Sequence, residues 1–518
     1  MRLDVSPVDR HVKGISTTMA RVIPSLTAAA AASLVVYQWA VARPLWLDEE
    51  MLAINLRERG LPQLAGALSL GQTAPYGWLA LQRLVLDMFG SGERALRAVP
   101  MIFGLASMAI ALWIGRRWLA PLGTSPLVLM TGVGQWVTYS YVEFKPYSAD
   151  VCLGLWLPAL AVWAIETDRV VIWWTVAAVA QFVANGATFV APGCAALIVV
   201  SVWRRRGLRA AFRAAVPGLL FLVLFGIHYV VALRPAQAST YLQTYWQLQF
   251  PPTHTGPIAI ITWFAPRLAA IAVKPGGTRI GVALWIAAVA GFVAATGRRR
   301  LLAVSFALVL LSSFALATAH VLPFFERLVL WIVPALFVGV AMLADVGRPG
   351  GLRYASTVIA ILFAADVAYV GLDDLRARPA ASHHRLDDRA SVRWLAAHEQ
   401  PGDVWVTTHL ALPAIWWYAG DRRIVEVGYR ESGCGDALHD QLSGATRALV
   451  YLGFRFDDVP NGFDDLLLTT LTERGRIVAF RGFGDDSRVA VVDLRLTSRR
   501  DLVPGRAGCV GAEPARRW

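Results

Sequence analysis

The feature that most constrains this chain is a series of apolar segments, each about as long as a membrane-spanning helix. A helix needs about 20 mostly apolar residues to cross a bilayer. Only 16% of the residues are charged, whereas soluble proteins carry about 25%. The segments lie near 22–41, 96–114, 123–140, 149–165, 170–185, 187–203, 214–233, 279–296, 302–320, 328–345 and 354–371. The sequence therefore predicts an α-helical polytopic membrane protein with about eleven transmembrane helices.

The basic residues predict how these helices are oriented. Lys and Arg gather in the cytoplasmic loops of membrane proteins, and the N-terminal segment carries Arg10, Lys13 and Arg21. If that segment is cytoplasmic, five further short connections fall on the same side, and all but the second are clearly basic: 116–117, 168–169, 204–206, 298–300 and 348–353. This pattern accounts for the net charge of +13, so we expect no nucleic-acid partner.

Three other connections then fall outside the cytoplasm, at 43–95, 139–150 and 234–278. They are richer in acidic, aromatic and proline residues, a composition typical of loops at a membrane surface. Residues 1–371 thus form the predicted transmembrane domain, surrounded by membrane lipids. The arginine-rich composition favours a bacterial inner (plasma) membrane, with the functional loops on the extracytoplasmic side.

Residues 372–518 are predicted to form a separate extracytoplasmic α/β domain. One segment has helical periodicity and three have the composition of strands between Pro-Gly and Gly turns: 390–399, and 403–408, 448–452 and 489–494. Cys434 and Cys509 also lie here. An oxidising compartment would favour a disulfide between them, and two free thiols fit the sequence nearly as well.

Three carboxylates follow the first apolar segment directly, at Asp48, Glu49 and Glu50. Such a run is often a solvated turn or the acidic first turn of a helix, where the helix dipole favours negative charge. Close to a membrane surface, a carboxylate can also serve as a general base. The sequence leaves both interpretations open until the other loops are considered.

The second outside loop adds Glu143, Lys145, Tyr147 and Asp150 at the mouth of two helices. Ionisable residues at such depth tend to mark functional sites. The chain has only three lysines, Lys13, Lys145 and Lys274, and the last two lie in loops predicted to be outside. A compact ammonium group suits a point contact to a phosphate, although chance and snorkelling to the interface remain the alternative.

Five elements in this order resemble the GT-C superfamily of membrane glycosyltransferases, especially the branch of protein O-mannosyltransferases and the lipid A aminoarabinose transferase. The resemblance covers roughly the first 350 residues. The usual histidine of the second element is absent, and Lys145 stands where many relatives have arginine, so the sugar and the acceptor are not identified. The elements are Asp48-Glu49, Gln72 to Tyr76, Phe89 to Pro100, Glu143 to Tyr147, and Glu326-Arg327 with Pro334.

The resemblance implies an inverting transfer of a sugar from a polyprenyl-phosphate donor to an acceptor hydroxyl. The acceptor would be a cell-envelope glycan, a lipid or a protein. Asp48 is the predicted base and Glu143 the alternative base, while Glu49 would orient the acceptor or tune Asp48. Cations would stabilise the leaving phosphate, and the remaining candidates would contact substrate. The phosphate candidates are Lys145, Lys274 and Arg327, and the substrate candidates are Tyr76, Tyr147 and Asp150.

A divalent cation such as Mg²⁺ or Mn²⁺ could take part, because carboxylates are its preferred ligands. No recognisable metal-ligand spacing is present, so the sequence names no metal ligand.

Two other functions compete with the transferase. A transporter or flippase for a lipid-linked sugar would place ionisable residues deep inside helices, and Asp366 in the last apolar segment is such a residue. A scaffold could instead bind a partner through the C-terminal tryptophans Trp394, Trp405, Trp416 and Trp417, which are more often core residues in a small domain.

Overall fold

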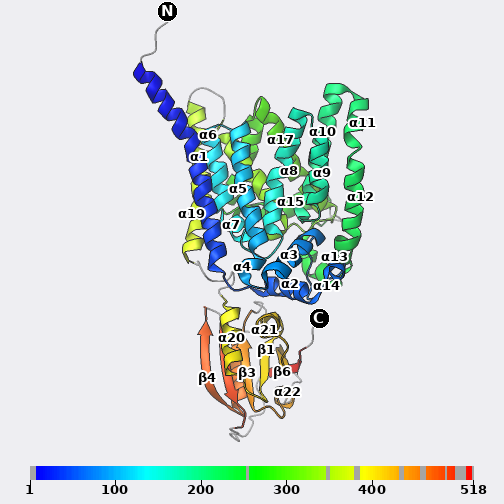
Figure 1. Ribbon diagram of the computed structural model, residues 1–518, viewed down its shortest axis with the longest axis vertical. Coiled ribbons are helices and arrows are strands. Elements are labelled where there is room, and N and C mark those ends of the chain that lie inside the picture. The colour runs from blue at the N-terminus through cyan, green and yellow to red at the C-terminus, as the bar shows by residue number, and fades with distance from the viewer. Residues whose placement is uncertain are drawn as a thin grey trace, which may run out of the picture. The chain divides into compact units, whose positions relative to one another are not determined.

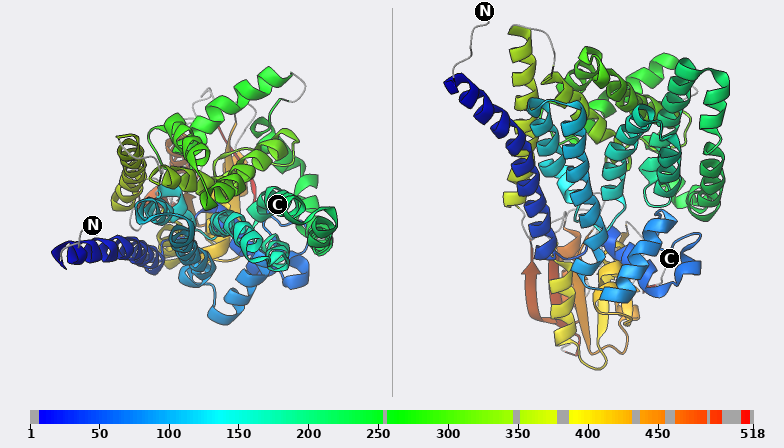
Figure 2. Two further views of the ribbon diagram at one scale, coloured as in Figure 1. Left: turned by 90° about the horizontal axis from the view of Figure 1, so that it is seen from above. Right: turned by 45° about the horizontal axis from the view of Figure 1, so that its top comes forward.

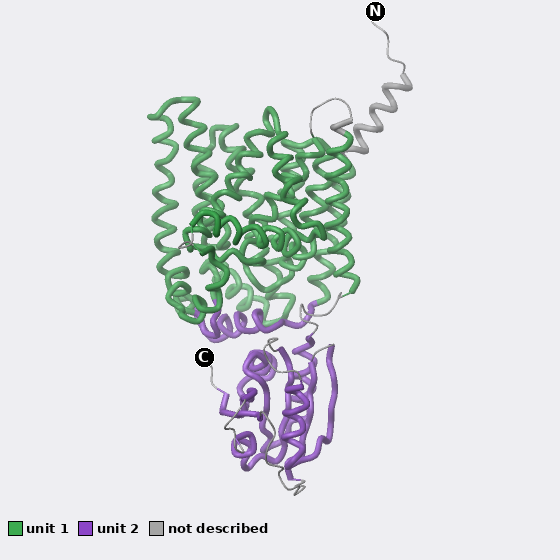
Figure 3. The backbone as a smooth tube through the Cα atoms, turned by 180° about the vertical axis from the view of Figure 1, so that it is seen from behind, with its two compact units in different colours: residues 1–41, 61–67, 73–377 green, residues 42–60, 68–72, 378–518 purple. Residues whose placement is uncertain are grey.

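A computed structural model describes residues 7–252, 256–345, 351–377, 386–430, 437–454, 462–484, 487–495 and 509–515, with side chains from residue 22 onward and not for 351–353. The chain divides into two compact units (Figure 3). The helical unit comprises Met1–Val41, Leu61–Ala67 and Thr73–Ala377, and the sheet unit comprises Ala42–Gly60, Leu68–Gln72 and Arg378–Trp518.

The helical unit is a bundle of mostly apolar helices that stand side by side and are seen end-on in the left view of Figure 2. The larger elements are α1 (Pro7–Val41), α5 (Ala98–Trp118), α6 (Pro121–Val133), α8 (Tyr147–Thr167), α9 (Val170–Ala180), α10 (Asn185–Arg206), α12 (Gly218–His228), α15 (Pro257–Val273), α16 (Gly281–Ala294), α17 (Arg298–Thr318), α18 (Val333–Leu343) and α19 (Gly351–Ala377). Smaller elements connect them: η1 (Leu61–Leu64), α3 (Tyr76–Phe89), α4 (Glu93–Leu96), α7 (Gln135–Ser140), α11 (Leu208–Ala215), η2 (Tyr229–Leu233), α13 (Arg234–Ala238), α14 (Thr240–Trp246), η3 (Gln247–Gln249) and η5 (Glu326–Ile332).

Eight helices in the described part of the chain are long and apolar enough to cross a membrane. The predicted segment 123–140 is divided at Gly134 into α6 and α7. Two other predicted segments correspond to the shorter helices α9 and α16, and the predicted loop 234–278 contains the apolar helix α15. The polytopic helical architecture is therefore confirmed, while the number eleven stays a prediction.

Small residues let some of these helices approach closely. A Cβ on Gly339 of α18 would lie 2.6 Å from the backbone oxygen of Ala288 in α16, and a Cβ on Gly291 of α16 would lie closer still to the Gly339 carbonyl oxygen. Where lipid surrounds a bundle, such close packing replaces the hydrophobic effect as the main attraction between helices.

Ion pairs join several predicted cytoplasmic connections at one end of the bundle. Glu166 at the end of α8 pairs with Arg117 at 2.9 Å and with Arg298 at 3.3 Å. Arg206 at the end of α10 pairs with Asp168 at 2.7 Å. Figure 1 shows α3, α4, α13 and α14 gathered at the opposite end. These contacts agree with the alternating helix direction that the basic loops predict.

The sheet unit contains a six-stranded mixed sheet with helices, as predicted for the C-terminal region. The strand order is β4-β5-β3-β1-β2-β6, in which β1 pairs in parallel with β2 and β3 and the other pairs are antiparallel. Its elements are α2 (Leu47–Glu58), α20 (Asp388–His398), β1 (Val404–Thr408), η6 (His409–Ala411), α21 (Leu412–Tyr418), β2 (Ile424–Arg430), α22 (Ala437–Gln441), β3 (Arg447–Leu452), α23 (Phe463–Thr472), β4 (Arg476–Phe483), β5 (Ser487–Asp493) and β6 (Cys509–Pro514).

Burial follows the position of each strand in this sheet. Every residue of the central strand β3 is buried, whereas the edge strand β4 is mostly exposed. Central strands covered on both faces read as continuous apolar runs. Trp405, Trp416 and Trp417 are also buried, so they serve the core. Cys509 is disulfide-bonded, and Cys434, the partner that the sequence suggests, lies outside the described residues.

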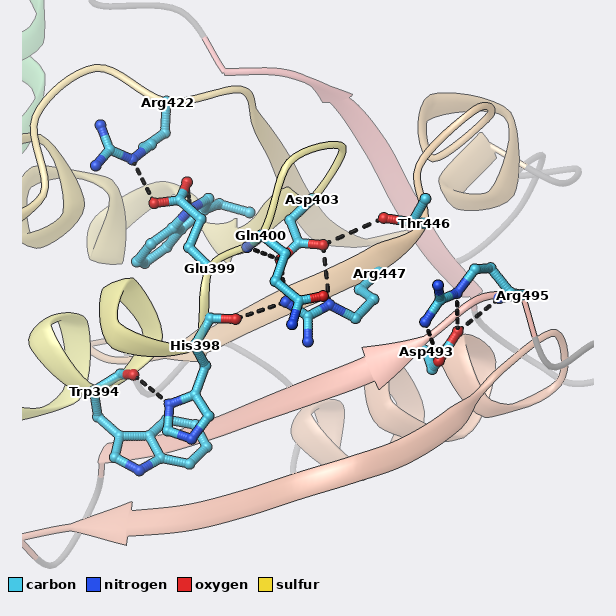
Figure 4. A network of polar contacts seen from close by, with 11 residues as sticks. Trp394, His398, Glu399, Gln400, Asp403, Arg422, Thr446, Arg447, Asp493 and Arg495 are labelled. Atoms are coloured by element: carbon cyan, nitrogen blue, oxygen red, sulfur yellow. Dashed lines mark hydrogen bonds and ion pairs between the residues drawn. The ribbon is translucent and has the colours of Figure 1, made fainter.

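A polar network fixes the end of α20 to the starts of β1 and β3 (Figure 4). Asp403 receives two bonds from the Arg447 guanidinium, at 2.6 and 3.0 Å. Arg447 also donates to the His398 carbonyl oxygen at 2.6 Å. The Asp403 side chain is fully buried and that of Arg447 is 11% exposed. This pair therefore stays protected from solvent, and losing one partner would leave a buried charge.

Candidate active site

The three acidic residues that follow the first apolar segment occupy the first turn of α2. Glu49 is fully buried, and its Oε2 accepts a hydrogen bond from the backbone N–H of Trp46 at 3.3 Å. This contact closes the start of the helix, as a glutamate at the third helical position commonly does. Asp48 is half-buried and Glu50 is buried. Asp48 is thus the most accessible carboxylate of the three, and Glu49 has at least a helix-capping role.

The loop that carries Glu143 and Lys145 is a tight buried turn between α7 and α8. The Lys145 N–H donates to the Glu143 carbonyl oxygen at 2.7 Å. The two residues are only 3% and 5% exposed. Burying charged groups is costly and tends to be retained for function. The structure thus places the alternative base and one phosphate candidate two residues apart on a single turn.

Asp150, a substrate candidate, lies one turn into α8 and caps a neighbouring helix. Its Oδ1 accepts a hydrogen bond from the Gly186 N–H of α10 at 2.6 Å, where the helix dipole favours a carboxylate. A Cβ at Gly186 would lie 2.7 Å from the Trp331 ring and 2.9 Å from this Oδ1. Glycine therefore permits the close approach of α8, α10 and η5, and one Asp150 oxygen is already used in holding them.

Lys274 and Arg327 lie far apart in the sequence, and the charges of both reach the carboxyl group of Glu326. Lys274 directly follows α15 and is exposed, while Arg327 lies in η5 and is half-buried. Both cations act electrostatically on the carboxylate of Glu326. Glu326 is therefore an acidic residue within electrostatic reach of two phosphate candidates. The sequence analysis did not select Glu326, although its position beside Arg327 in the fifth element was a signal for it.

The third phosphate candidate lies on an element adjacent to this cluster. The helix α8, which begins just after Lys145, packs against η5. A Cβ on Gly154 of α8 would be 2.7 Å from the Trp331 carbonyl oxygen. The helix that begins just after the Lys145 turn therefore packs against the segment that carries Arg327.

The two tyrosine candidates begin two helices. The Tyr76 hydroxyl donates to the Leu61 carbonyl oxygen at 3.3 Å, which ties the start of α3 to η1. Tyr147 is the first residue of α8, and both tyrosines are half-buried. Their contacts to substrate stay predictions.

Two further polar residues of α3 were missed by the sequence analysis. Trp78 and Gln82 are fully buried and one helical turn apart. The Trp78 Nε1 and both polar atoms of the Gln82 amide have no hydrogen-bond partner among the described residues. Trp78 packs against Phe144, with ring centroids 5.4 Å apart. Because buried polar groups are normally paired, these atoms are candidates for contacting a polar ligand beside the Lys145 turn.

Asp366, the acid that a transporter would need, is engaged in a structural contact. Its Oδ1 accepts from the Arg279 Nε at 2.6 Å, and its Oδ2 accepts from the Thr278 hydroxyl at 2.7 Å. The ion pair fixes α19 to the loop before α16. Asp366 is therefore explained without a transport pathway.

The described residues contain no group of three or more His, Cys, Asp or Glu side chains that could hold a metal ion. We therefore assign no residue as a metal ligand and derive no step through a metal.

Comparison with solved structures gives the following similarities. ArnT from Cupriavidus metallidurans bound to undecaprenyl phosphate matches with a TM-score of 0.51 at 15% identity, over 90% of this chain and 97% of that chain. The apo state of ArnT gives a TM-score of 0.47 at 15% identity, over 92% and 99% of the two chains. An apo oligosaccharyltransferase from Archaeoglobus fulgidus gives 0.46 at 11% identity, over 77% and 64%. No protein-family model matches the sequence, and no curated protein matches it. The first match shows a common fold.

Proposed function

The chain has the fold of the GT-C glycosyltransferases, represented by ArnT, and we propose that it transfers a sugar from a polyprenyl-phosphate donor to an acceptor hydroxyl. The acceptor is a cell-envelope glycan, lipid or protein on the extracytoplasmic side of a bacterial inner membrane. The observation that carries the proposal is the buried turn with Glu143 and Lys145 in a bundle of this fold. The undecaprenyl phosphate in the ArnT crystal supports the choice of donor.

The proposed reaction is a single displacement with inversion at the anomeric carbon. The acceptor oxygen forms a bond to the anomeric carbon while the bond from that carbon to the phosphate oxygen breaks. Asp48 takes the proton of the acceptor hydroxyl as general base. The bond electrons leave with the phosphate, so the second product is the polyprenyl phosphate.

The cationic residues would stabilise this leaving group. Lys274, Arg327 and Lys145 offer charge-assisted hydrogen bonds to phosphate oxygens, and their effect grows as negative charge develops there. Glu326 balances Lys274 and Arg327 before the donor binds. A phosphate leaving group needs no protonation by the protein, so no general acid is required.

The other candidates receive supporting roles. Glu49 holds the start of α2 and thereby orients Asp48. Glu143 is the alternative base, and Tyr76, Tyr147 and Asp150 are proposed to contact substrate. Each assignment rests on the family elements and on the positions described above.

The proposal is tested by transfer from a labelled polyprenyl-phosphate sugar, with purified protein in nanodiscs and membrane extract as acceptor. Asp48→Asn removes the base with little change in volume. Asp87→Asn is the matched control, because Asp87 lies on α3 and pairs with Arg83.

We expect Asp48→Asn to lose transfer by a factor of roughly 100 to 10,000, the usual contribution of a general base, while Asp87→Asn stays near the wild type. Transfer that is equal in both variants would remove Asp48 from the mechanism. A loss confined to Glu143→Gln would assign the base to Glu143.

A further inference from the structure

A second pair of carboxyl groups includes Glu50, two residues after the proposed base, and takes no part in the proposed reaction. Glu50 of α2 is 1% exposed and Asp388, the first residue of α20, is 2% exposed. Their side chains are hydrogen-bonded to each other. The Tyr451 hydroxyl of β3 donates to Asp388 Oδ1 at 2.6 Å. Two acids from distant parts of the sequence thus meet inside the sheet unit.

Two carboxyl groups can share a hydrogen bond only when one of them is protonated. Burial raises the pKa of Glu50 well above its usual value, and the charges of Asp388 and Glu49 raise it further. Burial also raises the pKa of Asp388 to about 6, against the lowering effect of the Tyr451 hydroxyl. Both shifts have the sign expected of a buried pair that holds one proton and carries only one charge.

This pair belongs to a set of contacts that attach α2 and the residues before it to the C-terminal elements. Arg57 donates to the carbonyl oxygens of Trp416 and Trp417 at 2.8 and 3.1 Å. The Tyr418 hydroxyl accepts from the Leu45 N–H at 2.9 Å, and Arg389 donates to the Ala42 carbonyl oxygen at 3.0 Å. Figure 3 accordingly colours α2 with the sheet unit.

Glu50 and Asp388 form the contact of this set that depends on a proton. The other four hydrogen bonds involve backbone groups, an arginine or a tyrosine hydroxyl, none of which changes charge near neutral pH. One Glu50 oxygen, Oε1, is buried without a hydrogen-bond partner among the described residues. Loss of the shared proton would therefore leave two buried carboxylates facing each other without compensation.

We propose that Glu50 and Asp388 are positioning residues for sugar transfer, which hold α2, and with it Asp48, on the C-terminal domain through their hydrogen-bonded carboxyl groups. The inference rests on the proposed function, because Asp48 is the base in that proposal. It gives the C-terminal domain a part in catalysis.

The contribution of this pair to the attachment of α2 decreases as pH rises. An acid whose pKa is raised in the folded protein contributes stability at pH values below its ordinary pKa, and the contribution is lost as pH rises through the raised pKa. The pair therefore holds α2 while it keeps its proton, and it releases α2 as pH rises through the raised pKa of Glu50. The charged and titratable groups around the pair are Glu49 on α2, Asp387 and Arg389 beside Asp388, and Tyr451 on β3.

Two variants distinguish the effect of the hydrogen bond from the effect of the titration. Glu50→Ala removes the hydrogen bond, whereas Glu50→Gln keeps a donor for Asp388 and cannot titrate. Glu58→Gln is the matched control, since Glu58 ends the same helix, its side chain is 37% exposed, and its 3.9 Å contact with Arg57 is longer than a hydrogen bond. Hydrogen–deuterium exchange of residues 47–58 in the full chain in nanodiscs reports the attachment without any substrate, and sugar transfer is measured in parallel.

In the wild type and in Glu58→Gln, we expect exchange protection of α2 and the rate of transfer to fall together as pH is raised. Glu50→Gln should keep both at alkaline pH. Glu50→Ala should lose both already at neutral pH, by roughly 100-fold in kcat, because a misplacement of about 1 Å can cost that much.

Identical pH profiles of exchange in the wild type and Glu50→Gln would overturn the proposal, and so would a Glu50→Ala variant with normal exchange and transfer. The expected exchange pattern without transfer from any donor would support the attachment and overturn the proposed function, so the two failures are distinguishable.

Discussion

The cluster of Lys274, Arg327 and Glu326 gives the sharpest prediction about donor binding. If both cations contact the donor phosphate, Lys274→Ala and Arg327→Ala should each raise the KM for the donor. A hydrogen bond to a charged group contributes about 1.5–3 kcal/mol, and about 1.4 kcal/mol corresponds to a factor of ten. The range is therefore roughly 10- to 150-fold.

Exposure decides where each variant falls in this range. Lys274 is exposed, so water already solvates its ammonium group and the increase should be about tenfold. Arg327 is half-buried and can bind a phosphate with two parallel hydrogen bonds, so its increase should approach 100-fold. Glu326→Gln should act in the opposite direction, because it removes the carboxylate that competes with the phosphate for both cations.

The assay is a donor titration at saturating acceptor for the three variants. Arg206→Ala is the control, since Arg206 is paired with Asp168 at the end of α10, where the basic connections gather. A KM for the donor that rises in Arg206→Ala as much as in Lys274→Ala would show that Lys274 has no specific contact with the donor phosphate. A KM that rises in Glu326→Gln would show that Glu326 supports donor binding directly.

Three further predictions test the remaining assignments. Gln82→Leu should lower kcat/KM by roughly tenfold or more without lowering the melting temperature. The buried Gln82 amide lacks a partner among the described residues and would bind substrate. Unchanged transfer with a higher melting temperature would mean that Gln82 is only a destabilising core residue. Asp366→Asn should lower the melting temperature and leave transfer within about twofold, because Asp366 forms an ion pair with Arg279. Complete loss of transfer would instead favour a role for Asp366 in transport. Asp403→Ala should destabilise the sheet unit by about 3–5 kcal/mol, because the substitution leaves the Arg447 charge buried and unpaired. An unchanged denaturation midpoint would contradict this predicted loss of stability.

The helical architecture could be predicted because the length of an apolar segment is a local property. Its details depend on single residues, whose effect is lost when hydropathy is averaged over a segment. Gly134 interrupts one predicted segment with an extended backbone, and α15 lies in a region whose prolines and polar flanks made it resemble a loop. The strands β1, β3 and β5 were predictable because their apolar runs stand between clear turn signals.

The site was predictable only as far as local motifs reach. Glu49 occupies the third position of a helix, where its capping role could have been inferred from the pattern alone. Glu326 became a candidate only when the fold brought Lys274 within electrostatic reach of it. The pairing of Glu50 with Asp388 joins opposite ends of the chain, and a single sequence carries no local signal for such a contact.

In the proposed reaction the protein cleaves a polyprenyl-phosphate sugar and passes the sugar on to an acceptor. The decisive experiment incubates the purified wild type in nanodiscs with a panel of radiolabelled polyprenyl-phosphate sugars and membrane extract. We expect one donor to release polyprenyl phosphate in step with label appearing on an acceptor. Labelled donors that all remain intact, with the protein folded, would contradict it and put a transporter or flippase of lipid-linked sugars first.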